Sequence, residues 1–207
     1  LSLIVAMTVV GLSNGLLLAY LPIRLAGMGF DPSVAGMLVA MLAVGGIIGC
    51  FVAGPLIQSL GQAKAFIAGG LLLLVSHAMT AVTADPTSWA IARVIYGIAL
   101  TQLFIVSYGW INASVTNQAR GTVQTLFYTS YIVALGVGGF GIAFLDVSGN
   151  MTPKVSMVLA TLGLIPMLIP GLPETAVPKG FAIRPIRAWK ISPVGFVGMF
   201  FVGDLRF

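Results

Sequence analysis

Residues 89–111, WAIARVIYGIALTQLFIVSYGWI, carry one charged side chain, Arg93, in an otherwise uncharged and mostly apolar run. The run falls within the roughly 17–25 residues that a helix needs to cross a bilayer. A charge inside such a helix costs about 2.5–3.5 kcal/mol on insertion scales, so it normally faces a cavity or a partner. The stretch therefore predicts a membrane-spanning helix with one unusual cation.

The composition of the whole chain agrees with a membrane protein. Of its 207 residues, 58% are hydrophobic and 7% are charged, and the mean hydropathy is +1.07, whereas soluble domains carry about 25% charged residues. Long apolar runs and 26 glycines favour a helical bundle over a barrel, whose strands alternate over about 10 residues. The net charge of +5 is spread over short connections without a basic patch, which argues against nucleic acid as a partner.

Charged residues, prolines and turn-forming residues divide the chain into six apolar spans of about the length of a crossing helix. The spans are residues 1–23, 33–57, 63–83, 88–111, 121–145 and 155–172. We therefore predict an all-α membrane protein in which residues 1–172 form a six-helix transmembrane bundle. The basic, proline-containing residues 173–191 are predicted to be a cytoplasmic linker, and residues 192–207 the truncated start of a seventh transmembrane helix.

The basic residues fall on alternate connections. One set contains Lys64, Arg120, Lys179, Arg184, Arg187 and Lys190, and the other contains only Arg24 and Lys154, accompanied by Asp31, Asp85 and Asp146. Cytoplasmic loops carry an excess of Lys and Arg. The first set is therefore predicted to be cytoplasmic, which starts the first helix inside the cell at the inner or plasma membrane.

Two stripes of small residues predict helices that pack closely, because small side chains let backbones approach in lipid. The stripes are Gly11, Gly15 and Ala19 in the first span, and Gly45, Gly49 and Ala53 in the second.

The connection after the second span reads GPLIQSLGQAK, residues 54–64, and resembles a loop of the major facilitator superfamily (MFS). Gly54, Gly61 and Lys64 match the pattern of that loop, whereas Gln58 stands where the family has Asp. The resemblance implies a gating loop that latches two halves of a transporter, although an amide at Gln58 can only hydrogen-bond there. A plain tight turn built on Gly61 is the alternative.

Arg93 and Gly97 resemble the fourth-helix motif of the same family, in which Gly follows Arg by four residues. Counting from Asp85, Arg93 lies about 10 Å into the membrane from the outer side. It binds an anionic substrate group, holds the charge of a proton-coupling carboxylate, or snorkels to the outer interface. No acidic residue lies in the middle of the six spans, so a counter-charge would come from the substrate or a missing half.

Helical spacing selects polar neighbours for Arg93. Tyr96 and Thr101 share its helix face, and the fifth span carries a polar stripe at i, i+4 and i+7. In the family, the first, fourth and fifth helices of each half line the central cavity. The substrate-binding candidates are therefore Arg93, Asn14, Tyr96, Thr101, Gln124, Tyr128 and Tyr131. Ordinary interhelical hydrogen bonds are the alternative for each.

The sequence offers little for enzymatic chemistry. His77 is expected at the depth of Arg93 across a helical hairpin, and the nearby guanidinium argues against a proton-carrying role. Cys50 is the only cysteine and His77 the only histidine, so no metal centre, disulfide or nucleophilic triad can be assembled within the chain. We expect no cofactor.

Two further stretches strengthen the resemblance. Residues 117–128, NQARGTVQTLFY, are similar to the family's cytoplasmic entry into the fifth helix, and residues 172–175, LPET, to the motif after the sixth. The fifth span lacks the Gly-Pro pair of many family antiporters, which weakens a role in efflux.

The resemblance implies the N-terminal half, or a fragment, of a secondary transporter that moves a small molecule through the membrane by alternating access, coupled to protons or another ion. Its partners would be lipid, the substrate, and a C-terminal half or a second copy. The alternative is a non-transporting membrane module or truncated gene product that only packs against a partner half. A membrane enzyme would need acid, base or metal-binding residues that the spans lack.

Overall fold

The computed structural model describes residues 1–168, which form helices joined by short connections. The long helices are α1 (Ser2–Gly27), α2 (Pro32–Leu60), α3 (Gln62–Val82), α4 (Pro86–Ser114) and α5 (Asn117–Gly141). The 3₁₀ turn η1 (Ile142–Phe144) extends α5, and η2 (Ile165–Met167) extends the shorter α6 (Met151–Leu164). These elements confirm the predicted all-α bundle.

Five helices are long and apolar enough to cross a membrane, and a shorter apolar helix covers Met151–Met167. The sixth element begins at Met151, earlier than the predicted residue 155, because Pro153 lies in its first turn, where a missing N–H breaks no helical hydrogen bond. The predicted end of this span at residue 172 lies outside the described residues. So do the linker and the seventh helix predicted for residues 173–191 and 192–207.

The helices begin and turn where the sequence supplies caps. The carboxylate of Asp31 accepts a hydrogen bond from the backbone N–H of Ser33, and that of Asp85 from Ser88, each at 2.8 Å. A proline follows each aspartate as the first helical residue. Gly61 has a φ of +81°, a left-handed conformation that glycine adopts freely, so α2 reverses into α3 at one residue.

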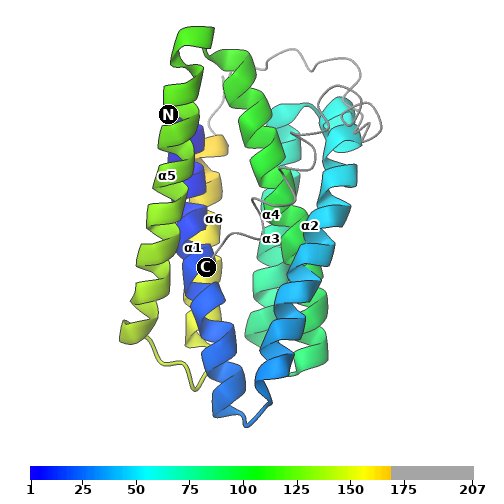
Figure 1. The fold of residues 1–207 in the computed structure, drawn as a ribbon, viewed down its shortest axis with the longest axis vertical. Helices are drawn as coiled ribbons and strands as arrows, with labels where there is room; N and C mark the ends of the chain where they lie inside the picture. Colours follow the sequence, from blue (N-terminus) through cyan, green and yellow to red (C-terminus); the bar gives the residue numbers. More distant parts are fainter. Residues whose placement is uncertain (169–207) are drawn as a thin grey trace, which may run out of the picture.

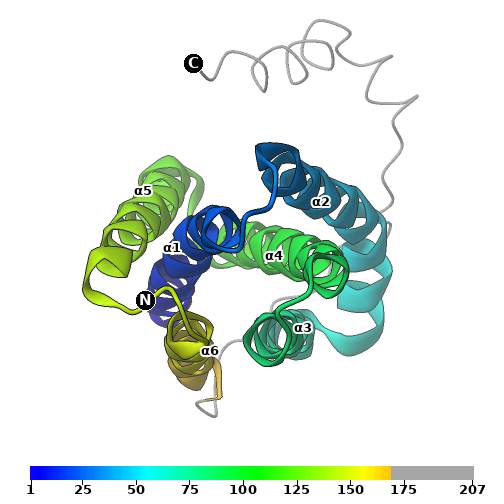
Figure 2. The same ribbon diagram turned by 90° about the horizontal axis from the view of Figure 1, so that it is seen from below.

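The bundle consists of two groups of three helices. α1 packs along α5 and α6, and α4 packs along α2 and α3, as seen along the bundle in Figure 2. α3 and α6 contact each other and join the two groups on one side. The α2–α3 and α4–α5 connections lie at one end of the bundle, and the α1–α2 and α5–α6 connections lie at the other (Figure 1).

Glycines set the closest helix contacts. A Cβ at Gly15 of α1 would overlap the backbone carbonyl of Leu135 in α5, and one at Gly45 of α2 would overlap that of Val94 in α4. Gly97 of α4 lies equally tightly against the backbone of α2. Such close approach replaces the hydrophobic drive that lipid does not provide. The predicted small-residue stripes therefore lie at the α1–α5 and α2–α4 interfaces.

The outward faces of α2 and α5 are strongly apolar. Ile47 and Phe51 of α2 are 63% and 64% exposed, and Phe140 of α5 is 70% exposed. Soluble monomers rarely show large contiguous apolar patches, whereas lipid tails or another apolar protein surface can cover such faces. The exposure pattern agrees with a membrane as the surrounding solvent.

Candidate functional site

Arg93 lies about two turns inside α4, whose start is fixed by the Asp85 cap. Its side chain is 3% exposed, so it does not snorkel to the surface of the bundle. The guanidinium carbon lies 4.4 Å from the centre of the Tyr96 ring, a cation–π contact worth about 0.5–2 kcal/mol. The face of a ring provides no oxygen or nitrogen acceptor, so this contact leaves the guanidinium N–H groups for other partners.

The charge of Arg93 is not balanced within the described part of the chain. Its Nε and Nη2 atoms are buried without a hydrogen bond, although buried polar groups nearly always find a partner. The acidic residues among residues 1–168 are Asp31, Asp85 and Asp146, and all three lie in connections between helices. An anion from a ligand or from another protein segment would therefore find the Arg93 guanidinium without a counter-charge.

A hollow of about 150 Å³ lies beside Arg93, between α1 and α2. Its other walls are apolar: Leu18, Leu21 and Pro22 from α1, and Ala35, Leu38, Val39 and Leu42 from α2. Leu18 and Val39 are 47% and 60% exposed, so the hollow adjoins the surface of the bundle on their side. One buried guanidinium thus borders an otherwise apolar recess.

Asn14 and Tyr131 form a second polar pair in the core. The Nδ2 of Asn14 donates to the Tyr131 hydroxyl at 3.0 Å, and both side chains are buried. The Tyr131 ring packs edge-on against Phe104 of α4, with centroids 4.8 Å apart. Gly11 makes room for it, because a Cβ there would lie 3.2 Å from the ring. The Oδ1 of Asn14 has no hydrogen-bond partner, so this pair retains one free acceptor.

The other predicted binding residues belong to neither of these two pairs. Gln124 donates to the side-chain oxygen of Asn112 at 2.8 Å, at the end of the bundle where α4 passes into α5. Tyr128 is 41% exposed on α5. Thr101 packs against α2: a Cβ added to Gly49 of α2 would lie 3.0 Å from the Cβ of Thr101. The structure pairs Arg93 with Tyr96 and Asn14 with Tyr131, and the binding role of all seven candidates stays a prediction.

A buried polar cluster that the sequence did not reveal joins three helices. Ser13 of α1, His77 of α3 and Ser156 of α6 are all 0% exposed. The Oγ of Ser13 lies 3.0 Å from Nε2 of His77 and 2.7 Å from the backbone oxygen of Ser156. The His77 ring centre is 5.9 Å from that of Tyr96, so the cluster adjoins the Arg93 group. The hydroxyls of Ser13 and Ser156 within apolar spans were a visible sign of buried hydrogen bonds. That they contact each other and His77 depends on which helices are neighbours, which the sequence does not show.

Hydrogen positions in this cluster follow from the donors and acceptors. The Nδ1 of His77 lies 2.7 Å from the Leu73 backbone oxygen, which can only accept, so Nδ1 carries a hydrogen. With a neutral ring, Nε2 accepts the hydroxyl hydrogen of Ser13; with a protonated ring, Nε2 donates and that hydrogen goes to the Ser156 carbonyl. One hydroxyl hydrogen therefore ties α1 either to α3 or to α6.

The predicted gating loop is a tight turn in this structure. The N–H of Gly61 donates to the Ile57 backbone oxygen at 2.9 Å, Gly54 is buried in α2, and Gln58 and Lys64 are exposed. This geometry fits the turn built on Gly61. A latch role for the loop requires a second half and stays a prediction.

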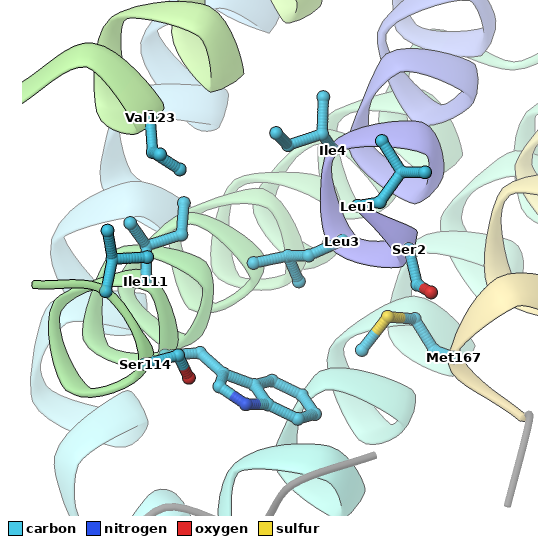
Figure 3. Close-up of a pocket in the computed structure, with 10 residues that line it drawn as sticks. Leu1, Ser2, Leu3, Ile4, Ile111, Ser114, Val123 and Met167 are labelled. Carbon is cyan, nitrogen blue, oxygen red and sulfur yellow. The ribbon is translucent and has the colours of Figure 1, made fainter. Parts of the chain in front are cut away.

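A second hollow, of about 190 Å³, lies at the opposite end of α1 from the Arg93 hollow. In Figure 3, Leu3 and Ile4 of α1 point across it toward Ile111 of α4 and Val123 of α5, with Met167 at its edge. Its walls are mostly apolar, and no charged side chain lines it among the described residues. Its polar lining consists of Ser2, Ser114 and Trp110, so it has no described charge with which to pair an ionic substrate.

Comparison with known families settles the class of protein. The sequence model of the Major Facilitator Superfamily matches residues 3–203. The chain therefore belongs to the Major Facilitator Superfamily, a family of membrane transporters, and the resemblance read from its motifs is confirmed.

Among curated proteins, the chain is similar to the arabinose-proton symporter of Bacillus subtilis (strain 168), with 24% identity over 110 residues. The aligned part is 53% of this chain and 24% of that protein.

Solved transporters share the fold. A peptide transporter POT in complex with sulfate matches with a TM-score of 0.69 and 19% identity, covering 99% of this chain and 44% of that one. The human organic anion transporter MFSD10 matches with a TM-score of 0.67 and 19% identity, covering 93% of this chain and 52% of that one. A D-xylose-proton symporter matches with a TM-score of 0.61 and 17% identity, covering 99% of this chain and 53% of that one. The chain thus spans about half the length of these transporters, and at such identities the likeness concerns the fold alone.

Proposed function

We propose that the protein works as the N-terminal half of a secondary transporter, which moves a small molecule across the membrane by alternating access. The observation that carries the proposal is the buried Arg93 guanidinium, unpaired and bordering a hollow inside a membrane bundle. Charged groups within membrane helices are rare and mark substrate or ion pathways. The similar proton symporters support coupling to protons, without fixing it for this chain.

Alternating access requires a second body for this bundle to move against. In transporters built from repeats, the substrate site lies near the bilayer midplane, where the halves meet, and one half rocks against the other. The apolar faces of α2 and α5, exposed in this chain, are suited to such a partner or to lipid. A C-terminal half fits the roughly double length of the similar transporters, and a second copy of this chain is the alternative.

The proposed orientation places the N-terminus in the cytoplasm. Lys64 and Arg120 lie at the end of the bundle that holds the α2–α3 and α4–α5 connections, and Arg24 and Lys154 lie at the opposite end. The excess of basic residues comes from Lys179, Arg184, Arg187 and Lys190, which follow α6 in the sequence and are assigned to the first end. The positive-inside rule then assigns the first end to the cytoplasm.

Cysteine labelling tests the orientation. Cys50 is the only cysteine of the chain, so Cys50→Ser provides a background for Lys64→Cys and Lys154→Cys. An impermeant maleimide added to intact cells should label the cysteine at position 154 and spare the one at position 64. The reverse pattern would invert the proposed topology.

Transport itself is tested in vesicles that contain the protein produced from its complete coding sequence. Uptake and efflux of a metabolite panel are measured with and without a proton gradient. Arg93→Ala should abolish transport of the accepted solute, while Lys154→Ala, which removes an exposed cation from the outer end, should leave it intact. Unchanged transport in Arg93→Ala would remove Arg93 from the site.

The second candidate is a membrane module that does not transport and only packs against a partner half. The observation that favours it is Gln58, which stands in place of the family's latch carboxylate. Failure of the intact protein to move any compound of the panel, in either direction and with any gradient, would select this candidate. An enzymatic activity is not part of the proposal, because membership of a transporter family points to translocation.

A further inference from the structure

The hollow between α1 and α2 has a composition that narrows the chemistry of its occupant. Its walls comprise one buried guanidinium, from Arg93, and seven apolar side chains. A sugar would bring several hydroxyl groups into a recess whose described walls offer them few partners, and each unpaired buried hydroxyl is costly. The described lining of this hollow therefore does not favour a sugar.

We infer that the hollow is a binding subsite for a small, apolar monocarboxylate, of which benzoate is a suitable probe. This inference rests on the proposed transport function and specifies its substrate class. A carboxylate neutralises the single charge and accepts two parallel hydrogen bonds from a guanidinium. A dianion would leave one buried charge unbalanced, and a cation would be repelled.

The size of the hollow sets the apolar part of the ligand. Its volume of about 150 Å³ equals that of a dry engineered cavity that holds benzene in another protein. An aromatic ring or a branched chain of similar bulk therefore fills the recess against Leu21 and Leu38, with its carboxylate toward Arg93. Larger solutes would need the helices to part.

The unpaired atoms of Arg93 show why an anion is needed here. The Tyr96 ring covers the guanidinium at 4.4 Å, but a ring provides no in-plane acceptor for the buried Nε and Nη2 hydrogens. A bound carboxylate supplies both the acceptors and the missing charge. A carboxylate from a partner half would satisfy Arg93 equally, and benzoate would then be excluded rather than bound.

The test is equilibrium binding of radiolabelled benzoate to the protein, produced from its complete coding sequence and held in nanodiscs, with empty nanodiscs subtracted. Benzyl alcohol and benzylammonium are the neutral and cationic competitors of equal size. Benzoate should bind, and neither competitor should displace it at a tenfold excess. Displacement by benzyl alcohol at equal concentration would refute the role of the charge and with it the inference.

Three variants locate the binding. Arg93→Gln should weaken benzoate binding roughly tenfold or more, because charge-assisted hydrogen bonds are lost. Ala35→Phe places bulk in the hollow while keeping the Arg93 side chain, and it should weaken benzoate binding similarly. Ala40→Phe adds the same bulk on an exposed part of α2 and should leave binding unchanged. Unaltered binding in both Arg93→Gln and Ala35→Phe would place benzoate elsewhere and overturn the inference. If Arg93→Gln does not fold, the result for Ala35→Phe alone decides the question.

Failure of this inference and failure of the proposed function give different results. A protein that transports another solute but neither binds benzoate nor is inhibited by it refutes the subsite and leaves the transport proposal standing. A protein that binds benzoate through Arg93, yet moves no solute, supports the subsite and refutes transport.

Discussion

Ser13 and Ser156 contact each other reciprocally: the Ser156 hydroxyl donates to the Ser13 backbone oxygen at 2.8 Å, and the Oγ of Ser13 lies 2.7 Å from the Ser156 backbone oxygen. The pair fastens α1 to α6 in the middle of the bundle, and the ring of His77 adds α3 to the same point. Three helices that are distant in sequence thus share one polar contact inside an apolar core.

Removing the Ser13 hydroxyl should destabilise the bundle more than removing that of Ser156. Interhelical hydrogen bonds in membranes are worth about 0.6–1.7 kcal/mol, and Ser156→Ala loses one of them. Ser13→Ala also deprives Nε2 of His77 of its partner, which adds an unsatisfied buried group. The midpoint of thermal unfolding in detergent measures the loss of stability in Ser13→Ala and in Ser156→Ala. Thr161→Ala, which removes a hydroxyl bonded only within α6, is the control. Equal shifts for all three variants would contradict a shared contact.

Enlarging Gly45 should separate α2 from α4. A Cβ at this position would meet the Val94 carbonyl, and overpacking of this kind costs about 1–3 kcal/mol. Gly45→Ala should therefore lower the midpoint of thermal unfolding. Gly36→Ala, on the same helix with no heavy atom within 4 Å of the new Cβ, should be neutral or stabilising by about 0.5–1 kcal/mol. A milder effect at position 45 than at position 36 would be inconsistent with this interface.

The Asp85 cap should make stability depend on pH at the acid end. The backbone N–H of Ser88, then its hydroxyl, hold the pKa of the Asp85 carboxyl below its usual range. Because the folded pKa lies below the unfolded value of about 3.9, the stabilisation is complete above that pH and is lost as pH falls through the folded pKa.

Asp85→Ala tests this cap by its unfolding midpoint relative to the parent protein. The difference in midpoint should be constant from about pH 5 to 8 and should shrink below about pH 4. Lys154→Ala, which removes an exposed side chain without a carboxyl group, should show no such convergence. A difference for Asp85→Ala that persists undiminished at pH 3 would count against the cap.

Tyr20→Phe should loosen the α5–α6 connection. The Tyr20 hydroxyl donates to the Gly149 backbone oxygen at 3.0 Å, which holds that loop against α1. Without the hydroxyl, amides of residues 145–150 should exchange with deuterium faster, while those of α1 are unchanged. Tyr128→Phe removes the same group from an exposed ring of α5 and should not alter exchange in the loop. Equal protection in both variants would show that the bond does not restrain it.

The fold was predictable from the chain because several helix boundaries have a local signal. Asp-Pro at residues 31–32 and 85–86 caps two helices, and Gly61 takes the conformation of a tight turn. The prediction ended α1 at residue 23, whereas the helix continues to Gly27 with Pro22 inside it. A proline removes only one backbone hydrogen bond, and the continuing apolar side chains outweigh that loss.

Two pairs of the predicted site residues meet in the structure: Arg93 with Tyr96 on one helix, and Asn14 with Tyr131 across α1 and α5. Arg93 and Tyr96 are three residues apart, and the spacing alone brings them together. Gln124 was grouped with them by its place on an amphipathic stripe, but its distance from Arg93 along the bundle axis depends on where α5 begins. The hollow beside Arg93 and the contact of Ser13 with Ser156 depend on which helices are neighbours, and no local pattern encodes that order.

The grouping of the helices departs from their order in the chain, since α1 belongs with α5 and α6 although α2 follows it directly. Nascent chains emerge from the N-terminus onward, so α2, α3 and α4 can assemble as soon as α4 has entered the bilayer. Until α5 has also entered, Asn14 lacks Tyr131, whereas Ser13 can already contact His77 of α3 before Ser156 of α6 arrives. Although α1 precedes α2, α3 and α4 in the chain, it is therefore expected to dock after they have assembled, and in the interval the side-chain amide of Asn14 stays without its hydrogen-bond partner.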